Sequence, residues 1–305
     1  MNVLVTGGAG FIGSHVVDAL IAQGHHVAVM DNLTTGKRAH VNPEAVFHHN
    51  DIRDPAIEDI ISTFQAEVVI HHAAQIEVAK SVAFPALDAE TNIIGSICLL
   101  EACRKRGVRK VIYASSAAVY GVPQTLPIAE NHPVAPLSGY GISKHTVEHY
   151  LSIYKDLYGL DYTILRYANA YGIRQDPRGE GGVVSVFTQR LLSGKPCIIQ
   201  GDGSQTRDFV YVTDIAQANC LALTRSDGDI LNIGTGTAVT IKQLCDIMSG
   251  LTPDAKLVEY APPRPGDIHD SCFDSGLARK NLEWEPQVSL QEGLECTLEY
   301  YRARL

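Results

Sequence analysis

The 305-residue sequence contains no C-x-x-C pair and no apolar run long enough to span a membrane. Its seven cysteines are odd in number and irregularly spaced, which argues against a disulfide framework and predicts a reduced, cytoplasmic setting. The opening residues, MNVLVTGG, reach glycine too early for a signal peptide. An excess of basic residues is also lacking. The net charge is −9, which argues against nucleic acid as the main partner.

The composition is that of an ordinary globular protein, with 45% hydrophobic and 19% charged residues. In the first half of the chain, short apolar runs alternate with helical patterns that end in glycine. Such alternation predicts an α/β fold, a Rossmann-type doubly wound parallel sheet covered on both faces. The strand-like runs are Val3–Val5, Val27–Met30, Val68–Ile70, Val111–Tyr113 and Tyr162–Leu165, and the predicted helices cover 12–22, 93–106 and 143–158.

The alternation weakens after Tyr171, where a loop rich in Gly, Arg, Asp and Pro covers 172–182. We therefore predict an NAD-binding domain at 1–172 and a smaller α/β substrate domain at 173–305. Parts of the second stretch, such as 214–223, are expected to pack back on the first domain. Its predicted helices cover 184–193, 215–223 and 241–250, and its strands cover 197–199, 209–212 and 230–233.

A glycine-rich segment, T-G-G-A-G-F-I-G-S, places Gly7, Gly10 and Gly13 between the first predicted strand and the first predicted helix. Glycines in this context let a pyrophosphate approach main-chain N–H groups, and the helix N-terminus adds free donors and partial positive charge. We expect Phe11 and Ile12 to contact the cofactor as well. The alternative is a tight strand–helix turn without a ligand.

Asp31 ends the second predicted strand, 18 residues past Gly13. A carboxylate there can accept hydrogen bonds from both adenosine ribose hydroxyls and repels a 2′-phosphate, which favours NAD over NADP. Lys37 and Arg38 follow closely and weaken that preference. For Asp31 itself, the alternative is an N-cap or turn residue. The remaining predicted cofactor contacts are Asn32, Asp51 and Ile52 near the adenine, Ala73 and Ala74 after the fourth strand, and Asn92, with core and turn packing as the alternative.

Tyr140 and Lys144 are four residues apart on a predicted helix, so the ammonium can stand beside the phenol. A nearby cation favours the phenolate and makes tyrosine a usable general base near neutral pH. Such a pair is common on helix surfaces. Here a predicted strand also ends in Ala114-Ser115-Ser116. Ser116 would lie near the nicotinamide, where its hydroxyl can bond a substrate oxygen.

The glycine loop, the acid, Ser116, Tyr140 and Lys144 occur in an order that resembles the extended short-chain dehydrogenase/reductase family, in its NAD-dependent epimerase/dehydratase branch. Within that branch, the chain is most similar to the enzymes that epimerise UDP-glucose and UDP-galactose at carbon 4. The resemblance covers essentially the whole chain. The matching stretches are VTGGAGFIGSH, DNL, HHAAQ, SSAAVYG, YGISK, RYANAYG, RDFVYVTDIA and RPGD.

This resemblance implies that Tyr140 is the acid/base, that Lys144 tunes it and holds the nicotinamide ribose, and that Ser116 orients the sugar hydroxyl. The implied reaction moves a hydride from the sugar to NAD and back through a 4-keto sugar, leaving NAD bound. The implied substrate contacts are Ser116, Tyr140, Asn169, Val183, Arg207, Arg264, Asp267 and Ser271. Of these, the two arginines would clamp the diphosphate and Asp267 would bond the uridine ribose.

Three positions depart from the most similar enzymes. The small Ser271 stands where a bulkier residue narrows the sugar pocket, and this implies that N-acetylated sugars are also admitted. Ile76 replaces a lysine and Ala168 replaces an aromatic residue. UDP-glucuronate is therefore an alternative substrate.

Related dehydratases and decarboxylases carry carboxylates just after the matching serine, where this chain has Ala117-Ala118. We therefore expect epimerisation, with a nucleotide-sugar dehydratase or oxidoreductase as one alternative and a non-catalytic NAD-sensing regulator as a remote one. The pattern H-x-x-E-H at 145–149 lacks a third zinc ligand, and no metal is expected. By resemblance, the chain forms a homodimer through the helices near 93–106 and 141–158, with no membrane partner.

Overall fold

A seven-stranded sheet in the order β11-β6-β5-β4-β1-β2-β3 forms the centre of the larger part of the molecule, and all its neighbouring strands run parallel. The computed structural model describes residues 1–177, 182–252, 258–263 and 268–304. The chain order reverses between β1 and β4, which makes a crevice at the carboxyl ends of these strands. The strands are β1 (Asn2–Thr6), β2 (His26–Met30), β3 (Val46–His48), β4 (Val68–His71), β5 (Lys110–Ser116), β6 (Asp161–Tyr167) and β11 (Asp229–Ile233).

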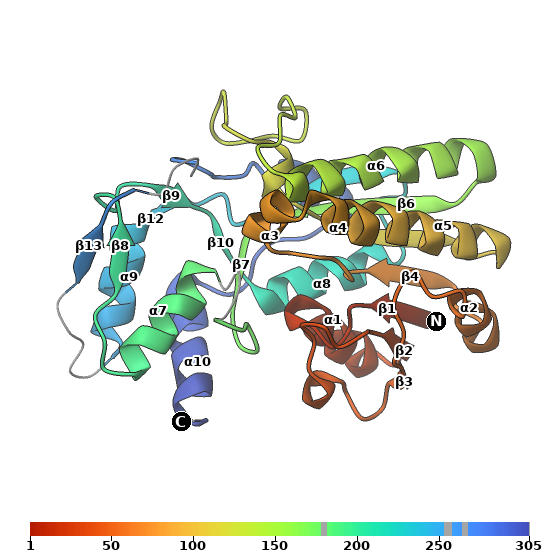
Figure 1. Ribbon diagram of the computed structural model, residues 1–305, viewed down its shortest axis with the longest axis horizontal. Coiled ribbons are helices and arrows are strands. Elements are labelled where there is room, and N and C mark those ends of the chain that lie inside the picture. The colour runs from red at the N-terminus through yellow and green to blue at the C-terminus, as the bar shows by residue number, and fades with distance from the viewer. Residues whose placement is uncertain (178–181, 253–257, 264–267, 305) are drawn as a thin grey trace.

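Helices cover both faces of this sheet (Figure 1). Because successive strand residues point to opposite faces, Val3 and Val5 pack into one core and Leu4 into the other. The first core is closed by α1 (Phe11–Ala22) and α8 (Val212–Ala222), and the second by α2 (Ile57–Phe64), α5 (Gly95–Lys105) and α6 (Gly139–Tyr158). Between β4 and α5 the chain forms α3 (Val78–Ala83), α4 (Pro85–Ala89) and a π-helical turn (Glu90–Ile94). Short 3₁₀ turns cover Arg38–His40 and Ala117–Val119.

The smaller part has its own core, in which Phe187, Leu244, Met248 and Leu298 are buried. Among the described residues, three helices and three two-stranded sheets belong to this part or join it to the larger one (Figure 1). The helices are α7 (Val183–Leu192), α9 (Ile241–Gly250) and α10 (Leu290–Arg302). The strand pairs are β7 (Asn169–Tyr171) with β10 (Phe209–Tyr211), β9 (Thr206–Arg207) with β12 (Val239–Thr240), and β8 (Ile198–Gln200) with β13 (Glu259–Ala261). A π-helical turn covers Ala278–Leu282.

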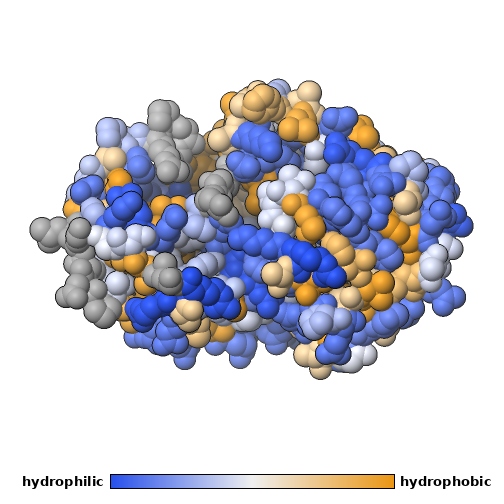
Figure 2. Space-filling view, turned by 60° about the horizontal axis from the view of Figure 1, so that its bottom comes forward, coloured by the Kyte–Doolittle hydropathy of each residue, from blue (hydrophilic) through white to orange (hydrophobic). Residues whose placement is uncertain are grey.

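The predicted parallel sheet and its covering helices are confirmed. Two elements that follow residue 172 in the sequence complete this sheet and its cover, because β11 pairs with β6 and α8 packs against α1. Hydrophilic residues prevail on the face shown in Figure 2, and apolar residues form small groups on it. Among the described helices, none combines the length and the apolar character needed to cross a membrane.

Candidate active site

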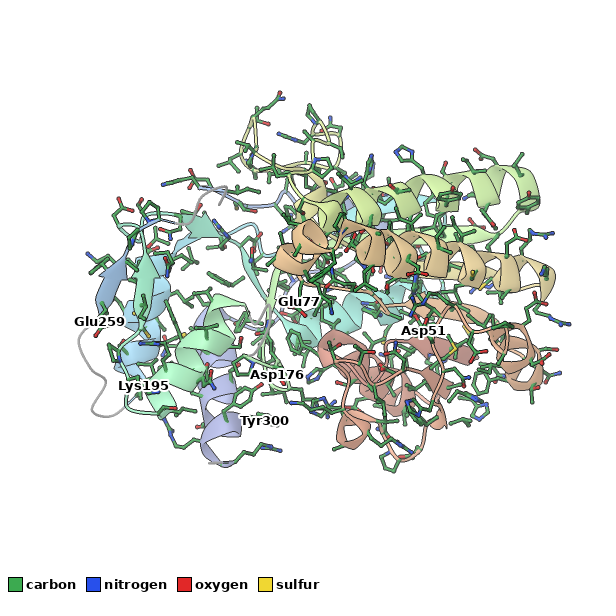
Figure 3. All side chains as sticks on the ribbon, in the orientation of Figure 1. Asp51, Glu77, Asp176, Lys195, Glu259 and Tyr300 are labelled. Atoms are coloured by element: carbon green, nitrogen blue, oxygen red, sulfur yellow. The ribbon has the colours of Figure 1, made fainter. Side chains whose placement is uncertain are left out.

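A cavity of about 390 Å³ opens at the carboxyl ends of β1, β2, β4 and β5, where the chain order of the sheet reverses. Figure 3 labels Asp51 on the larger part and Glu77 nearer the smaller part, and both side chains line this cavity. Most of the predicted cofactor contacts are brought together here. They are Gly7, Gly10, Phe11, Ile12, Asp31, Asn32, Asp51, Ile52, Ala73 and Ala74, with Tyr140 and Lys144 in the same lining.

The glycine loop leaves no room for side chains. Gly7 has φ +70°, and a Cβ there would lie 2.6 Å from the backbone nitrogen of Ala73. A Cβ on Gly13 would lie 2.3 Å from the carbonyl oxygen of Gly7. Gly10 is the N-cap of α1 and provides no side-chain cap, so N–H groups at this helix end are open to an anion. This cradle fits the pyrophosphate of a dinucleotide.

We expect Gly13→Ala to abolish retention of NAD, because the new methyl group must displace the backbone of Gly7. The change is measured by mass analysis of the nucleotide released from purified protein. Gly24→Ala is the control for the stability cost, because a Cβ on Gly24 meets nothing within 4 Å, although its φ of +79° strains the backbone. Full NAD occupancy in Gly13→Ala would contradict this assignment.

Asp31 and Asp51, the two carboxylates predicted to contact the adenosine, line the cavity in different surroundings. Asp31 is buried, and it accepts hydrogen bonds from the backbone nitrogens of Ala9 at 3.0 Å and Leu33 at 2.8 Å. A carboxylate accepts about four hydrogen bonds, so capacity remains for ribose hydroxyls. Asp51 accepts from Asn32 Nδ2 at 2.7 Å and is paired with Arg53. Hydrogen bonds from Arg53 hold the pKa of Asp51 down to about 2, so this carboxylate stays ionised.

Asn92 does not line the cavity. Its side-chain nitrogen donates to the carbonyl oxygen of Gln75 at 2.9 Å and to Ser143 Oγ at 3.1 Å, and its oxygen accepts from the Gln75 N–H at 2.7 Å. Asn92 therefore fixes Gln75, which does line the cavity. Any effect of Asn92 on a bound cofactor would pass through this loop.

The first two turns of α6 carry the Tyr140 phenol and the Lys144 ammonium into the cavity. Ser138 Oγ caps this helix by accepting from the Gly141 N–H at 3.2 Å, so Tyr140 lies where the positive end of the helix dipole also favours a phenolate. Lys144 Nζ donates to the carbonyl oxygen of Ala114 at 2.9 Å and lies 5.9 Å from the Tyr140 ring centre. Burial lowers the pKa of Lys144 to about 8.

Ser116 is the last residue of β5, and its Oγ accepts a hydrogen bond from the Ala118 N–H at 3.2 Å. It is not part of the cavity lining, whereas its neighbour Ser115 is. Ser116 pairs in the sheet with Tyr167, another lining residue. The hydroxyl of Ser116 is thus held at the rim of the crevice.

Four other predicted substrate contacts, Asn169, Val183, Arg207 and Ser271, lie outside the cavity lining, on the smaller part or at its junction. Asn169 begins β7 and Val183 begins α7. Arg207 Nη1 donates to the carbonyl oxygens of Thr206 at 2.7 Å and His269 at 3.1 Å, and the Ser271 N–H donates to that of Thr206 at 3.2 Å. Arg207 and Ser271 therefore flank the same backbone. Arg264 and Asp267 lie outside the described residues.

Several residues near the site were not predicted from the sequence. His72 lines the cavity and its Nε2 lies 3.1 Å from the Tyr167 hydroxyl, and burial lowers the pKa of His72 to about 3. Lys80 also lines the cavity, from α3, four residues after Ile76 in the sequence. His72 follows β4 directly, so the strand-end position that predicts contacts for Ala73 and Ala74 applies to it as well. No pattern in the sequence marks Lys80.

The fold and this cavity define a Rossmann-type dinucleotide-binding protein in which Tyr140 and Lys144 line the same cavity as the glycine cradle. Residues 3–234 match the NAD dependent epimerase/dehydratase family. The chain belongs to this family, whose cofactor is NAD, and the glycine cradle and Asp31 fit that cofactor.

Individual relatives are similar over nearly their full length. The UDP-glucose 4-epimerase of Mycolicibacterium smegmatis is 42% identical over 309 residues, which cover 99% of each chain. The structure of a UDP-glucose 4-epimerase with UDP-glucose from Thermotoga maritima superposes with a TM-score of 0.97 at 49% identity, over 100% of this chain and 99% of the other. The structure of a UDP-N-acetylglucosamine 4-epimerase from Methanobrevibacter ruminantium, in complex with UDP-N-acetylmuramic acid, superposes with a TM-score of 0.94 at 37% identity. The superposition covers 100% of this chain and 99% of the other.

Proposed function

We propose that the chain is an isomerase that inverts carbon 4 of a UDP-sugar, with NAD as a cofactor that stays bound. The observation that carries this proposal is that Tyr140 and Lys144 line the same cavity as the glycine cradle. An acid/base pair next to a dinucleotide suits reversible removal of a hydride and a proton from one carbinol. The UDP-glucose 4-epimerases among its relatives match this chain over 99% to 100% of its length.

The protein's residues handle the proton. Tyr140 takes the proton of the 4-hydroxyl, and Lys144 stabilises the phenolate by its charge. Ser116 bonds the same sugar oxygen and orients it. The glycine cradle and Asp31 would hold NAD, and the bound cofactor would supply the acceptor and donor of the hydride at carbon 4. The resulting 4-keto sugar turns within the site, Tyr140 gives the proton back, and the product has the opposite configuration.

The surroundings of Ser116 favour epimerisation over loss of water. The turn that follows it consists of Ala117, Ala118 and Val119, so no carboxylate is available there for elimination. A dehydratase or oxidoreductase would need an acid or base from elsewhere.

The smaller part supplies the contacts to the UDP group in this proposal. Arg207 and Arg264 bind the diphosphate, since a guanidinium bonds two phosphate oxygens at once. Asn169, Val183 and Asp267 complete the UDP site. The small Ser271 leaves space for an N-acetyl group, so the proposed substrates are UDP-glucose and UDP-galactose together with their N-acetylated counterparts. UDP-glucuronate is the alternative.

Purified protein is incubated in turn with UDP-glucose, UDP-N-acetylglucosamine and UDP-glucuronate, and the products are separated by chromatography. We expect the 4-epimer to form until equilibrium is reached, without added NAD when the cofactor is retained. Loss of water from the sugar, or a net rise in free NADH, would overturn the epimerase proposal. The preferred sugar is read from the ratio of kcat/KM values.

We further propose that the chain forms a homodimer through the outer face of α6. Ile142, Ile153 and Leu157 are exposed at helical spacing on this face, with Ile94 exposed at the start of α5. Sedimentation is expected to give about twice the 33.1 kDa chain mass. The double variant Ile153→Asp with Leu157→Asp should be monomeric, and Tyr260→Ser on β13 is the exposed control. A monomeric wild-type protein would contradict the dimer.

The cytoplasmic location stays a prediction.

A further inference from the structure

A buried ion pair lies directly behind the proposed catalytic residues. Glu148 and Arg166 are 4% and 3% exposed, and they meet through two contacts, Nε to Oε1 at 3.0 Å and Nη2 to Oε2 at 2.5 Å. Burial acts to raise the pKa of Glu148, but the hydrogen bonds and charge of Arg166 hold it down to about 2. The carboxylate and the guanidinium are therefore both charged inside the protein, at a high desolvation cost.

Glu148 connects this pair to two of the proposed catalytic residues. It follows Tyr140 and Lys144 at intervals of four on α6, so all three lie along one side of the helix. Its Oε1 accepts a hydrogen bond from Ser115 Oγ at 2.6 Å, and Ser115 directly precedes Ser116. Glu148 thus ties the helix that carries the phenol to the end of the strand that carries Ser116.

Arg166 holds Tyr120, which follows Ser116 in the sequence, by a hydrogen bond. Its Nη1 donates to the Tyr120 hydroxyl at 2.9 Å, and that hydroxyl donates to Asn232 Oδ1 on β11 at 2.7 Å. Ser116 therefore lies between two anchors, Ser115 and Tyr120, which both lead to the same ion pair. The pair joins β5, β6, β11 and α6.

We infer that Glu148 and Arg166 are positioning residues that set the mutual placement of Ser116, Tyr140 and Lys144. This inference rests on the proposed function. Misplacement of reacting groups by about 1 Å costs on the order of 100-fold in rate. An ion pair that joins β5 and α6, the two elements that carry these groups, therefore has a direct effect on catalysis. A buried pair kept only for stability is commonly replaceable by apolar residues.

The pair also acts on the charge of Lys144. The carboxylates that act on this ammonium are Asp88 on α4 and Glu148 on α6. Two imidazoles also interact with its charge, His71 on β4 and His72 directly after it. The rings of Tyr113 on β5 and Tyr140 on α6 face it. His145, one turn from Glu148, contacts its Oε2 at 3.1 Å. Removing the Glu148 charge takes away an attraction that raises the pKa of Lys144 and leaves the Arg166 charge unbalanced, so protonated Lys144 is disfavoured. The alkaline limb of the activity profile should then move to lower pH.

Three variants test the inference by kcat, KM and the pH profile of kcat. We expect Glu148→Gln to lower kcat by about 30- to 100-fold with little change in KM, and to shift the alkaline limb down by about 0.5 to 1 pH unit. Ser115→Ala keeps both charges, so kcat should fall about 3- to 10-fold with the limb unmoved. In Glu148→Gln with Arg166→Met, the limb should return while kcat stays low.

Glu58→Gln, which removes the same charge from a surface pair with Lys105, is the matched control and should behave as wild type. The inference is overturned if folded, NAD-loaded Glu148→Gln keeps wild-type kcat and pH profile. If Glu148→Gln does not fold, Ser115→Ala decides, and a wild-type kcat in that variant overturns the inference. If the wild-type protein is inactive, the proposed function is contradicted and the positioning inference is not, because the variants are compared with an active wild-type protein.

Discussion

Replacing Tyr140 by phenylalanine is expected to lower kcat by about 1,000-fold or more while leaving NAD bound. A positioned acid/base contributes about 100- to 10,000-fold, and the phenol is the one lining group that the proposed reaction uses for proton transfer. Phenylalanine keeps the ring and removes only the hydroxyl. The Lys144 bond to the Ala114 carbonyl at 2.9 Å stays in place, so the fold should persist. Turnover of UDP-glucose and mass analysis of the bound nucleotide measure the two effects.

Tyr158→Phe provides the control on the same helix, because Tyr158 is exposed at the far end of α6 and should tolerate the change. Loss of kcat in both variants would point to a general effect on the helix. A Tyr140→Phe protein that keeps its wild-type turnover would remove the phenol from the mechanism. If its biological activity were intact without turnover, the NAD-sensing regulator would replace the enzyme as the better account.

The features that sequence analysis predicted best are those that a short stretch of chain encodes. The glycine cradle lies within seven residues, and its context between β1 and α1 gives it meaning. Tyr140 and Lys144 face the same cavity because four residues make about one helical turn. The alternation of Val3, Leu4 and Val5 between two cores likewise follows from strand geometry alone.

The helix α6 begins at Gly139, before both starts that the sequence predicts, Ser143 from the helical pattern and Tyr140 from its spacing to Lys144. Gly139 and Gly141 have low helix propensity, so the local sequence does not favour a helix at these two residues. The structure shows why glycine is needed. A Cβ on Gly141 would lie 2.4 Å from the Ala118 carbonyl oxygen, and one on Gly139 would lie 2.9 Å from that of Ser81. Close packing of three segments outweighed local propensity at this helix end.

Long-range pairings were beyond prediction from the sequence. Glu148 and Arg166 belong to different elements, and His72 meets Tyr167 across 95 positions of the sequence. Nothing in the local pattern of 229–233 showed that β11 pairs with β6 and extends the large sheet. These contacts depend on which elements become neighbours, and a single sequence does not contain that information locally.

Replacing Lys144 by methionine is expected to lower kcat by about 100-fold or more and to abolish the alkaline limb of the pH profile. Burial lowers the pKa of Lys144 from 10.5 to about 8. The ammonium is therefore charged below pH 8, and it loses its proton as the pH rises through that value. Without the charge, the Tyr140 phenolate loses its stabilising partner, so wild-type activity should fall on the alkaline side near pH 8.

Methionine fills a similar volume without a charge, so the variant should be slow at every pH and show no fall near pH 8. Lys155→Met is the control on the same helix, because Lys155 forms a surface pair with Asp161 at 2.7 Å and is remote from the cavity lining. Its pH profile should match that of the wild-type protein. If Lys144→Met kept the alkaline limb, a different group would titrate there. The ammonium would then have to act by holding the nicotinamide ribose, and weaker NAD retention would be its remaining signature.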